Sequence, residues 1–535
     1  MSGTHRPVGI TRRGLLAGTA LAALSAASGE LLRPAAGETP RRGGTMVVTG
    51  HQEISSLSPD DAGPTVIWTA VTQIHNALVE LDENYALVPT LAQSYSAAPD
   101  GLTYTFKLRR GVRFHDQTEF TAEDVKYTYE WYMNPANHAI TANNFQGVEA
   151  VDVLDRYTVR VRMKHPNAAF LAKGASTFIV PAAYHSRVGE KAYKSAPIGT
   201  GAFRLKEWKP AEHTLLQAFD EHFRGRPYLD FFRVDIVPEP SVRAIGLQTG
   251  ASDSAVWPLL VEDNLRFAKD PHFTTFVTLT LGVNHFPINN KRPMFADRRV
   301  RQAMLYAIDR QRLIDDVFKG TAVIATSHLS PALKTYYEPH VAQYPHDPAK
   351  ARALLDEAGW RVGPDGIREK DGVKLSFTCV TITGDQARRP EAEVAQQDLR
   401  AVGIEMKLAE APVATITEKL RKGEMDASLF NWTYGGSGGD PDPSVTLRSN
   451  GGNNWSHYAN PKVDSLIDAG LKEVNPAKRR PLYGEIQKIV AEEVPFLYVM
   501  YWHWYTIFTK RIKGLPKTAL NGPQLYRKAY QWWIG

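Results

Sequence analysis

The sequence predicts an α/β fold made of several structural units. Its 535 residues are 43% hydrophobic and 22% charged, an ordinary composition for a globular protein. At roughly 100–200 residues per domain, this length corresponds to about three units, each able to bury its own core. Patterns typical of strands and of helices are mixed along the chain without a fixed repeat, which favours an α/β architecture. The single cysteine, Cys379, excludes an internal disulfide, and its apolar surroundings predict a buried strand thiol.

The first 36 residues resemble an export signal. The string TRRGLL at 11–16 opens an uncharged stretch rich in Leu and Ala, as in a twin-arginine signal peptide. This stretch is too short and too weakly apolar to predict a membrane span. Because no Cys lies near the expected cleavage region, we expect a soluble periplasmic protein without a lipid anchor.

The first half of the mature chain predicts strands around one clear helix. A strand is expected at 43–48, and apolar residues alternate with polar ones at 102–108 and 159–163, as in half-buried antiparallel strands. Between them, Thr121 and Asp124 have the spacing of a capping box. The helix that they begin is expected to end before Pro135.

The second half predicts a separate α/β domain. Asp297 is the expected N-cap of a helix whose apolar positions run through Val300, Met304, Ile308 and Phe318 to a stop at Gly320. A second helix begins at Asp347-Pro348, where Pro loses no hydrogen bond in the first turn, and ends at Gly359. A third helix at 391–402, closed by Gly403, precedes a strand at 404–408.

The most enzyme-like string is the glycine loop at 435–439. Gly-Gly-Ser-Gly-Gly formally matches the nucleophile elbow of hydrolases, with Ser437 in the place of the nucleophile. The elbow needs a helix directly after the Ser, whereas Gly-Gly-Asp-Pro-Asp-Pro follows here. A binding loop after a strand at 427–432 is therefore favoured, and a secreted hydrolase using Ser437 is kept as an alternative.

Other catalytic and nucleic-acid signatures are missing from the sequence. There is no H-E-x-x-H, no paired C-x-x-C and no Gly-Lys dipeptide, so zinc-protease, thiolate-metal and P-loop sites are not expected. Asp440 and Asp442 could hold a cation, but Pro follows each and favours turns. A net charge of +6 over 535 residues, without a Lys/Arg run, does not predict nucleic-acid binding.

Aromatic residues are the stronger indication of a binding site. Trp432 and Tyr434 precede the glycine loop, Trp455 follows it, and YWHWY forms a dense run at 501–505. Aromatic faces line pockets for varied ligands, with a few polar groups setting orientation. If the run is a strand, its members alternate between two faces, so about half of them are expected in the core.

Five segments together resemble one protein family over nearly the whole mature chain. They are TYTFKLRRGVRFHD with TAEDV (103–125), PIGTGAFRL (197–205), RPMFADRRVRQAMLYAIDRQRLI (292–314), YPHDPAKARALLDEAGW (344–360) and the region from VDSLIDAG to EEVPFLY (463–498). In this order they are similar to the family-5 extracellular solute-binding proteins of ABC importers, which include dipeptide-, oligopeptide- and nickel-binding proteins.

The resemblance implies a two-lobed type II periplasmic-binding-protein fold with a hinge. The expected division is a signal at 1–36, a first lobe at 37–281 with an inserted subdomain at about 70–195, a second lobe at 282–499, and a return to the first lobe at 500–535. The chain is expected to cross between lobes at 281–284 and 499–503. Ligand between the lobes contacts both and therefore favours closure.

The resemblance also implies ligand contacts. In peptide-binding relatives an Asp shortly after the loop Trp pairs with the ligand's α-amine, but Gly435 stands at that place here. Asp440 lies farther along and is a candidate substitute. Arg388 and Arg389 resemble the basic residue that binds the peptide carboxylate in dipeptide-binding relatives, although a solvated pair at a helix start is the alternative. The expected ligand-binding residues are Trp432, Tyr434, Gly435, Asp440, Arg388, Arg389, Asn284 and Trp502.

The function that the resemblance implies is capture of a small polar solute, such as a short peptide or peptide-like compound, for an ABC importer. The expected partners are membrane permease and ATPase subunits, the protein is expected to be a monomer, and no cofactor, resident metal or catalytic residue is expected. A carrier of a metal chelate or haem is the nearest alternative. A chaperone role, with unfolded segments held between the lobes, is a weaker one.

Overall fold

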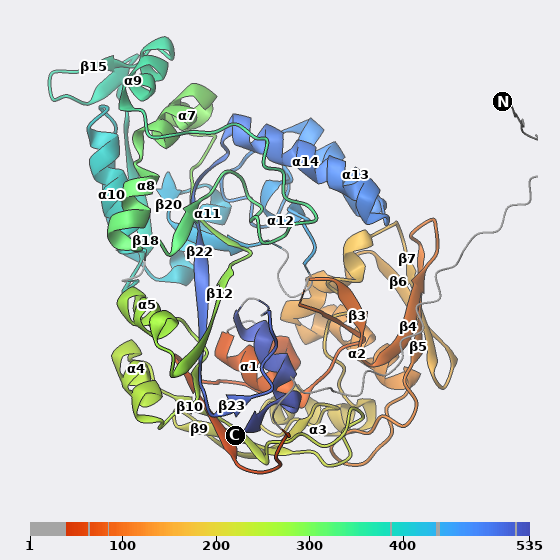
Figure 1. Cartoon of the computed structure of the whole chain (residues 1–535). Helices are drawn as coiled ribbons and strands as arrows, with labels where there is room; N and C mark the ends of the chain where they lie inside the picture. The colour runs from red at the N-terminus through yellow and green to blue at the C-terminus, as the bar shows by residue number, and fades with distance from the viewer. Residues whose placement is uncertain are drawn as a thin grey trace, which may run out of the picture. The chain divides into compact units, whose positions relative to one another are not determined.

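The computed structural model describes residues 39–62, 65–83, 85–385, 388–434, 439–518, 520 and 522–535. The predicted signal at 1–36 and the predicted site residues Gly435 and Ser437 lie outside these ranges. Residues 40–535 form one unit of mixed helices and strands (Figure 1). The predicted α/β class is therefore found.

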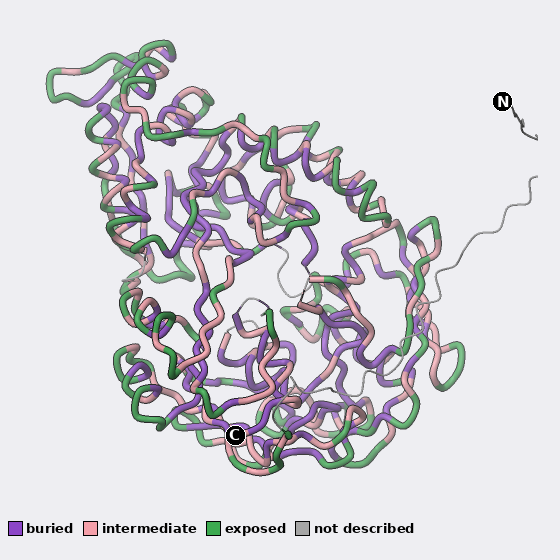
Figure 2. The backbone as a smooth tube through the Cα atoms, viewed as in Figure 1, coloured by how far each residue is buried: buried purple, intermediate pink, exposed green. Residues whose placement is uncertain are grey.

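A ten-stranded sheet is the largest element of this unit. Its order is β21-β13-β22-β11-β1-β10-β9-β8, and β12 and β14 also pair with β22. The strands are β1 Thr45–Gly50, β8 Phe203–Lys209, β9 His213–Ala218, β10 Phe231–Ile236, β11 Ser254–Ala255, β12 Phe273–Leu279, β13 Gly282–Pro287, β14 Ala322–Ile324, β21 Phe430–Thr433 and β22 Phe496–Thr509. In Figure 2 buried residues follow these strands, and exposed residues lie mainly on the outer sides of the helices.

Strand β22 changes its partners along its length. Its first part pairs with β13 from Pro287↔Phe496 to Asn284↔Met500. Its second part pairs with β12 from Leu279↔His503 to Phe273↔Thr509. The neighbours therefore change at 280–282 and 500–503, next to the two crossings that the resemblance implies.

A four-stranded antiparallel sheet lies inside the segment predicted as the inserted subdomain. Its order is β4-β5-β7-β6, from Ala92–Ala97, Thr103–Leu108, Thr158–Met163 and Val148–Asp155. Tyr104, Phe106 and Leu108 are buried, as their alternation predicted. Helix α2, Ala122–Met133, begins as expected, because the Asp124 carboxylate accepts a 2.8 Å bond from the backbone N–H of Thr121. This sheet and α2 share a hydrophobic core of their own.

A third sheet carries helices of the second half. Parallel strands β19 Glu405–Ala411, β18 Ser376–Ile382 and β20 Ala427–Ser428 pair in that order. Cys379 is fully buried in β18, as predicted, and burial raises the pKa of its thiol. The helices include α7 Arg298–Ala307, α9 Pro348–Glu357, α10 Arg389–Arg400 and α11 Val413–Lys422.

The predicted helix from Asp297 to Gly320 is wrong in its second half. Asp297 caps α7 as expected, but α7 ends at Ala307 and Ile308 is extended. Asp309 then accepts a bond from the backbone N–H of Arg312 and begins a new short helix, α8 Arg310–Arg312, which leads into a π turn. The apolar periodicity continued across this break because both helices pack on the same core.

The remaining elements frame these sheets. The helices are α1 Thr65–Ile74, α3 Ala182–Tyr193, α4 Pro240–Thr249, α5 Val261–Lys269, α6 Pro293–Ala296, α12 Ser444–Leu447, α13 Pro461–Lys472, α14 Pro476–Glu493 and the 3-10 helices η1 Pro59–Asp61, η2 Pro135–Asn137, η3 Ile140–Phe145, η4 Ala168–Phe170 and η6 Gly522–Gln531. The short strands are β2 Val79–Leu81, β3 Leu87–Pro89, β15 Arg361–Val362, β16 Arg368–Lys370, β17 Val373–Lys374, β23 Ile512–Lys513 and β24 Trp533–Ile534. Within the described ranges, no helix is both long and apolar enough to cross a membrane.

Candidate functional site

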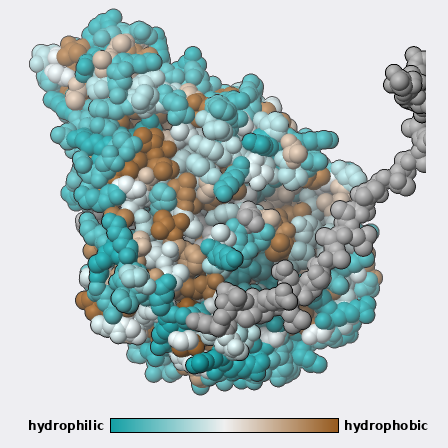
Figure 3. All heavy atoms as spheres, viewed as in Figure 1, coloured by the Kyte–Doolittle hydropathy of each residue, from teal (hydrophilic) through white to brown (hydrophobic). Residues whose placement is uncertain are grey.

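An open pocket lies between two segments that are far apart in the sequence. Residues 143–146 and 172–173 form one wall, and residues 432–434 and 440–446 form the other. The empty space is about 830 Å³, including its open mouth. The first wall belongs to the segment that carries the four-stranded sheet, and the second wall follows β21. Hydrophobic surface gathers in the hollowed middle of the face that Figure 3 shows, inside a mostly hydrophilic rim.

Three of the predicted site residues line this pocket. Trp432 is half-buried, with its ring edge-on to Trp455 at 5.9 Å. Tyr434 is buried, and its hydroxyl lies 2.8 Å from Thr446 Oγ1. Burial raises the pKa of Tyr434, so it stays a neutral phenol. Asp440 is the third of these residues and is also buried, with 7% of its surface exposed.

The two acidic residues of the pocket are both paired. Asp440 accepts bonds of 2.7 and 3.3 Å from the Arg479 guanidinium, which also donates to the Gly470 carbonyl. Burial alone would lower the pKa of Arg479, but Asp440 outweighs it and holds that pKa well above its usual value. Asp442 contacts Lys173 Nζ at 2.8 Å, across the pocket. Burial opposes ionisation of Asp442, yet the Lys173 charge keeps its pKa lowered.

A second group of predicted residues meets at β13 and β21. Asn284 and Asn431 face each other across these strands. Asn284 Nδ2 donates to Glu391 Oε1 at 2.6 Å, and Arg388 donates to Asn431 Oδ1 at 2.6 Å and to the Asp385 carboxylate at 2.5 Å. Burial raises the pKa of Glu391 to about 8. The side chains of Asn284 and Arg388 thus both have hydrogen-bond partners within the protein.

Arg389 has different surroundings from Arg388. Its side chain is half exposed and pairs with Glu393 at 2.9 Å and Glu410 at 3.1 Å. Arg389 is thus a solvent-exposed residue at the start of α10. This geometry agrees with the alternative to a carboxylate-binding role. Arg388 is the more buried of the two.

Trp502 lies where β22 changes partners. It is half-buried, and a Cβ added to Gly282 would come within 2.5 Å of its ring. Two residues on, Trp504 packs edge-on against Trp257 at 5.2 Å, and Trp257 lies 4.5 Å from His51. Tyr501, Trp504 and Tyr505 are buried, so about half of the aromatic run is in the core as expected, although the neighbours Trp504 and Tyr505 do not alternate.

Most of the chain matches a known family. The family model described as "Bacterial extracellular solute-binding proteins, family 5 Middle" matches residues 86–455. The chain belongs to this family. Family-5 proteins bind solutes and are not enzymes, so the expected absence of an enzyme activity is confirmed and the secreted hydrolase using Ser437 is excluded. The protein is an extracellular or periplasmic solute-binding component of an ABC transporter.

Similar family-5 proteins have different names and ligands. The oligopeptide-binding protein AppA of Bacillus subtilis (strain 168) is 28% identical over 513 residues, 92% of this chain and 92% of that protein. Its structure in complex with a nonapeptide has a TM-score of 0.79 at 26% identity, covering 93% of this chain and 100% of AppA. The glutathione-binding protein GsiB of Salmonella choleraesuis (strain SC-B67) is 29% identical, covering 89% of this chain and 93% of GsiB.

A metal-binding relative has the same fold. The structure of NikZ from Campylobacter jejuni in complex with Ni(L-His) has a TM-score of 0.78 at 25% identity, covering 91% of this chain and 99% of NikZ. These likenesses confirm the predicted family-5 fold. Across the described ranges of this family-5 chain, no cluster of three or more His, Cys, Asp or Glu side chains could hold a metal ion.

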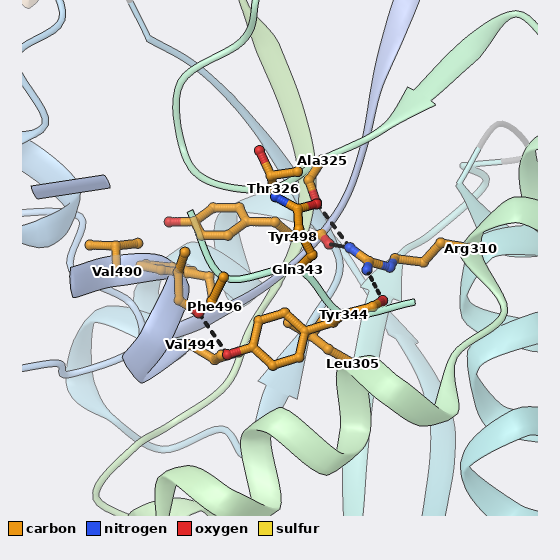
Figure 4. Close-up of a pocket in the computed structure, with 12 residues that line it drawn as sticks. Leu305, Arg310, Ala325, Thr326, Gln343, Tyr344, Val490, Val494, Phe496 and Tyr498 are labelled. Carbon is orange, nitrogen blue, oxygen red and sulfur yellow. Dashed lines mark hydrogen bonds between the residues drawn. The ribbon is translucent and has the colours of Figure 1, made fainter. Parts of the chain in front are cut away.

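A smaller cavity of this family-5 protein serves its structure. It lies inside the second half, where Arg310 donates to the carbonyls of Ala325, Tyr498 and Tyr344 at 2.9, 3.0 and 2.5 Å (Figure 4). Burial lowers the pKa of Arg310 to about 10, which leaves it charged at neutral pH. Arg310 therefore links three segments of backbone through the hydrogen bonds of its two terminal nitrogens.

Sequence reasoning missed the residues that come from the opposite wall and from beneath the pocket. Lys173, Arg479 and Glu391 carry no local motif, and each meets its partner across 39 to 269 residues of chain. Asn143 likewise carries no local motif.

Proposed function

We propose that this protein captures a small polar solute, such as a short peptide or peptide-like compound, between two lobes and delivers it to a membrane permease. The observation that carries the proposal is the pocket with Trp432, Tyr434 and Asp440 on one wall and residues 143–146 and 172–173 on the other. Walls from two separate segments give a ligand contacts to both, which is what ligand-driven closure requires.

The proposed division follows the boundaries expected from the sequence: lobes at 37–281 and 282–499, a return at 500–535 and an inserted subdomain at about 70–195. The change of partners along β22 supports a hinge at 280–282 and 500–503. We further propose export by a twin-arginine signal at 1–36, a monomeric periplasmic protein without a lipid anchor, and separate permease and ATPase subunits as partners.

Native mass spectrometry of the protein exported by its own host tests this function. We expect one small solute per chain, which is then released and identified. Trp432→Ala should reduce its retention, because the ring forms part of the pocket wall. Trp208→Ala on β8, at the opposite end of the ten-stranded sheet from β21, is the control and should retain the solute. Absence of any bound solute, with no thermal shift from a broad peptide and metabolite panel, would count against the proposal.

A metal-chelate carrier is the second candidate, favoured by the similarity to NikZ with bound Ni(L-His). Since the described residues supply no metal cluster, the chelating molecule would have to provide most ligands itself. Elemental analysis of the exported protein, followed by titration with chelated nickel, separates the two candidates. A metal-free protein that gives no heat with the chelate excludes this carrier function.

A further inference from the structure

The charged side chains expected to bind the ends of a peptide are all paired within the protein. Asp440, the candidate partner for an amine, is held by Arg479. Arg388, a candidate partner for a carboxylate, is held by Asp385 and Asn431. Neither side chain is left to neutralise a ligand charge.

The other two charges follow the same pattern. Arg389, the second candidate for a carboxylate, pairs with Glu393 and Glu410. Asp442, the second acidic residue of the pocket, pairs with Lys173 from the opposite wall. Both acidic residues of the pocket lining are therefore paired, Asp442 with Lys173 of the opposite wall and Asp440 with Arg479.

Burial makes these pairs costly to break. The side chains of Asp440 and Arg479 are 6% and 5% exposed, and that of Asp442 is 3% exposed. Removing one partner of a buried pair leaves an uncompensated charge, which is strongly unfavourable in a buried site. A ligand ammonium would have to compete with Lys173 or Arg479 for a carboxylate that is already neutralised, so it gains little from either pair.

Among the described residues that line the pocket, the polar groups left for a ligand are uncharged. The pocket lining offers the amides of Asn143 and Gln146 and the hydroxyl of Thr433, beside the half-exposed ring of Trp432. Amides and hydroxyls donate and accept hydrogen bonds, and an indole face packs on a flat apolar surface.

We propose that this pocket selects an uncharged solute that carries hydroxyl or amide groups around one flat apolar face. A sugar ring and an end-blocked peptide share this chemistry. The inference rests on the proposed binding function and narrows its ligand to a class without charged ends. Lys173 is the residue that sets this selectivity, because it cancels the charge of Asp442 from the opposite wall.

Three probes test the selectivity by titration calorimetry on the exported mature protein. Maltotriose and N-acetyl-trialanine amide are uncharged, and trialanine has both charged ends. We expect one of the uncharged probes to bind at least about tenfold more tightly than trialanine. Its affinity should change little between low and high salt, since no ion pair is formed. Binding of maltotriose alone identifies the sugar class, and binding of the blocked peptide alone identifies the peptide class.

The variant Lys173→Met should change the preference for uncharged ligands. It frees Asp442, so trialanine amide, with its free ammonium and blocked carboxyl end, should gain about tenfold or more in affinity. Lys164→Met, at an exposed lysine of the same segment, is the matched control, and its affinity for trialanine amide should not increase. If Lys173→Met unfolds, the double variant Lys173→Met with Asp442→Asn removes both charges and should keep the wild-type preference for the uncharged probe.

The outcomes separate this inference from the proposed function. Wild-type protein that binds trialanine as tightly as the uncharged probes, with affinity that falls steeply with salt, overturns the inference and leaves the binding function standing. If no probe binds, the solute released in native mass spectrometry decides: a charged solute overturns the inference and an uncharged one supports it. Absence of both a probe and a released solute rejects the inference together with the binding function.

Discussion

At the scale of single residues, buried charges in this protein differ in how completely they are paired. Arg310 donates to three carbonyls, whereas Nε and Nη2 of Arg527 have no hydrogen-bond partner in the described part of the chain. Arg527 is nine-tenths buried and stacks on Trp68 at 4.9 Å. Burial lowers its pKa to about 10. We therefore expect the two buried guanidinium groups to contribute very differently to the free energy of unfolding.

Replacing each of these arginines by Met should show that difference. Arg310→Met strands three buried carbonyls and should lower the free energy of unfolding by about 3 kcal/mol or more. Arg527→Met removes a guanidinium group whose Nε and Nη2 make no hydrogen bonds with described residues. This variant should change the free energy of unfolding by less than about 1 kcal/mol. Urea denaturation followed by circular dichroism measures both. Equal losses for the two variants would contradict the argument.

The buried carboxyl of Glu391 predicts a pH dependence of stability. Its folded pKa of about 8 lies above the ordinary 4.5, because burial outweighs the bond from Asn284 and the Arg388 charge, while Asp385 raises it further. Folded protein therefore binds more protons than unfolded protein between these values. Its stabilising contribution is complete below pH 4.5 and is lost as the pH rises through 8, by at most about 1.4 kcal/mol per pH unit.

Glu391→Gln provides the comparison, since Gln has the shape of the protonated acid and does not titrate. The free energy of unfolding of the wild type, minus that of the variant, should fall steadily from pH 5 to pH 8. Neighbouring groups such as His285, whose pKa burial lowers to about 4, are present in both proteins and cancel. A difference that stays flat over this range would show that Glu391 ionises normally in the folded state.

At the scale of elements, the sequence predicted well wherever local chemistry decides. Asp347 caps α9 and Pro348 occupies its first turn, and α2 ends at Met133 before Pro135, as expected. These ends depend on hydrogen bonds between residues a few positions apart. The break after Ala307 was missed, because an apolar stripe continues while Asp309 competes for backbone N–H groups.

The candidate site was predictable only in part, for a related reason. Trp432 and Tyr434 stand beside a glycine loop, and this local pattern identified one wall of the pocket. The other wall is set by long-range packing, so neither Lys173 nor the pairing of Asp440 with Arg479 can be seen in the sequence. Which charges are available to a ligand is therefore a property of the folded chain.

Gly282, which lies at the proposed hinge, gives a prediction for the strands that meet there. Gly282→Ala places a Cβ 2.5 Å from the Trp502 ring and 3.2 Å from Thr433 Oγ1, where β13, β21 and β22 meet. Such overpacking should lower the free energy of unfolding by about 1–3 kcal/mol. Adding Trp502→Phe to the same chain replaces the indole by a smaller phenyl ring. It should recover part of the lost free energy of unfolding.

A double-mutant cycle measures this coupling. The two changes together should be less destabilising than the sum of their separate effects by about 1 kcal/mol, since one makes room for the other. Gly452→Ala is the control, because nothing lies within 4 Å of its Cβ position. Additive effects of Gly282→Ala and Trp502→Phe would mean that the ring moves aside without cost.

At the scale of the whole molecule, β22 is the one long strand that pairs with β13 and β14 through its first part and with β11 and β12 through its second. A strand shared in this way resists unfolding of either part alone, yet it can bend where its partners change. Closure about 280–282 and 500–503 would bring the pocket walls together around a solute without breaking either set of pairs. Lys173 and Asp442 already join the two walls at 2.8 Å in this structure, and closure would keep that ion pair.

Spin labels on introduced cysteines test this closure. Ile245 in α4 and Val362 in β15 are 55% and 62% exposed and lie on opposite sides of the proposed hinge. Cys379 is fully buried with a raised thiol pKa, so it should not react with the label. Adding back the solute released from the exported protein should shift the distance distribution between Ile245→Cys and Val362→Cys to shorter values. The distance distribution between labels at Ile245→Cys and Leu260→Cys, which lie on one side of the proposed hinge, should not change. If both pairs stay constant while the solute binds, the lobes do not close on it and recognition is by a preformed pocket.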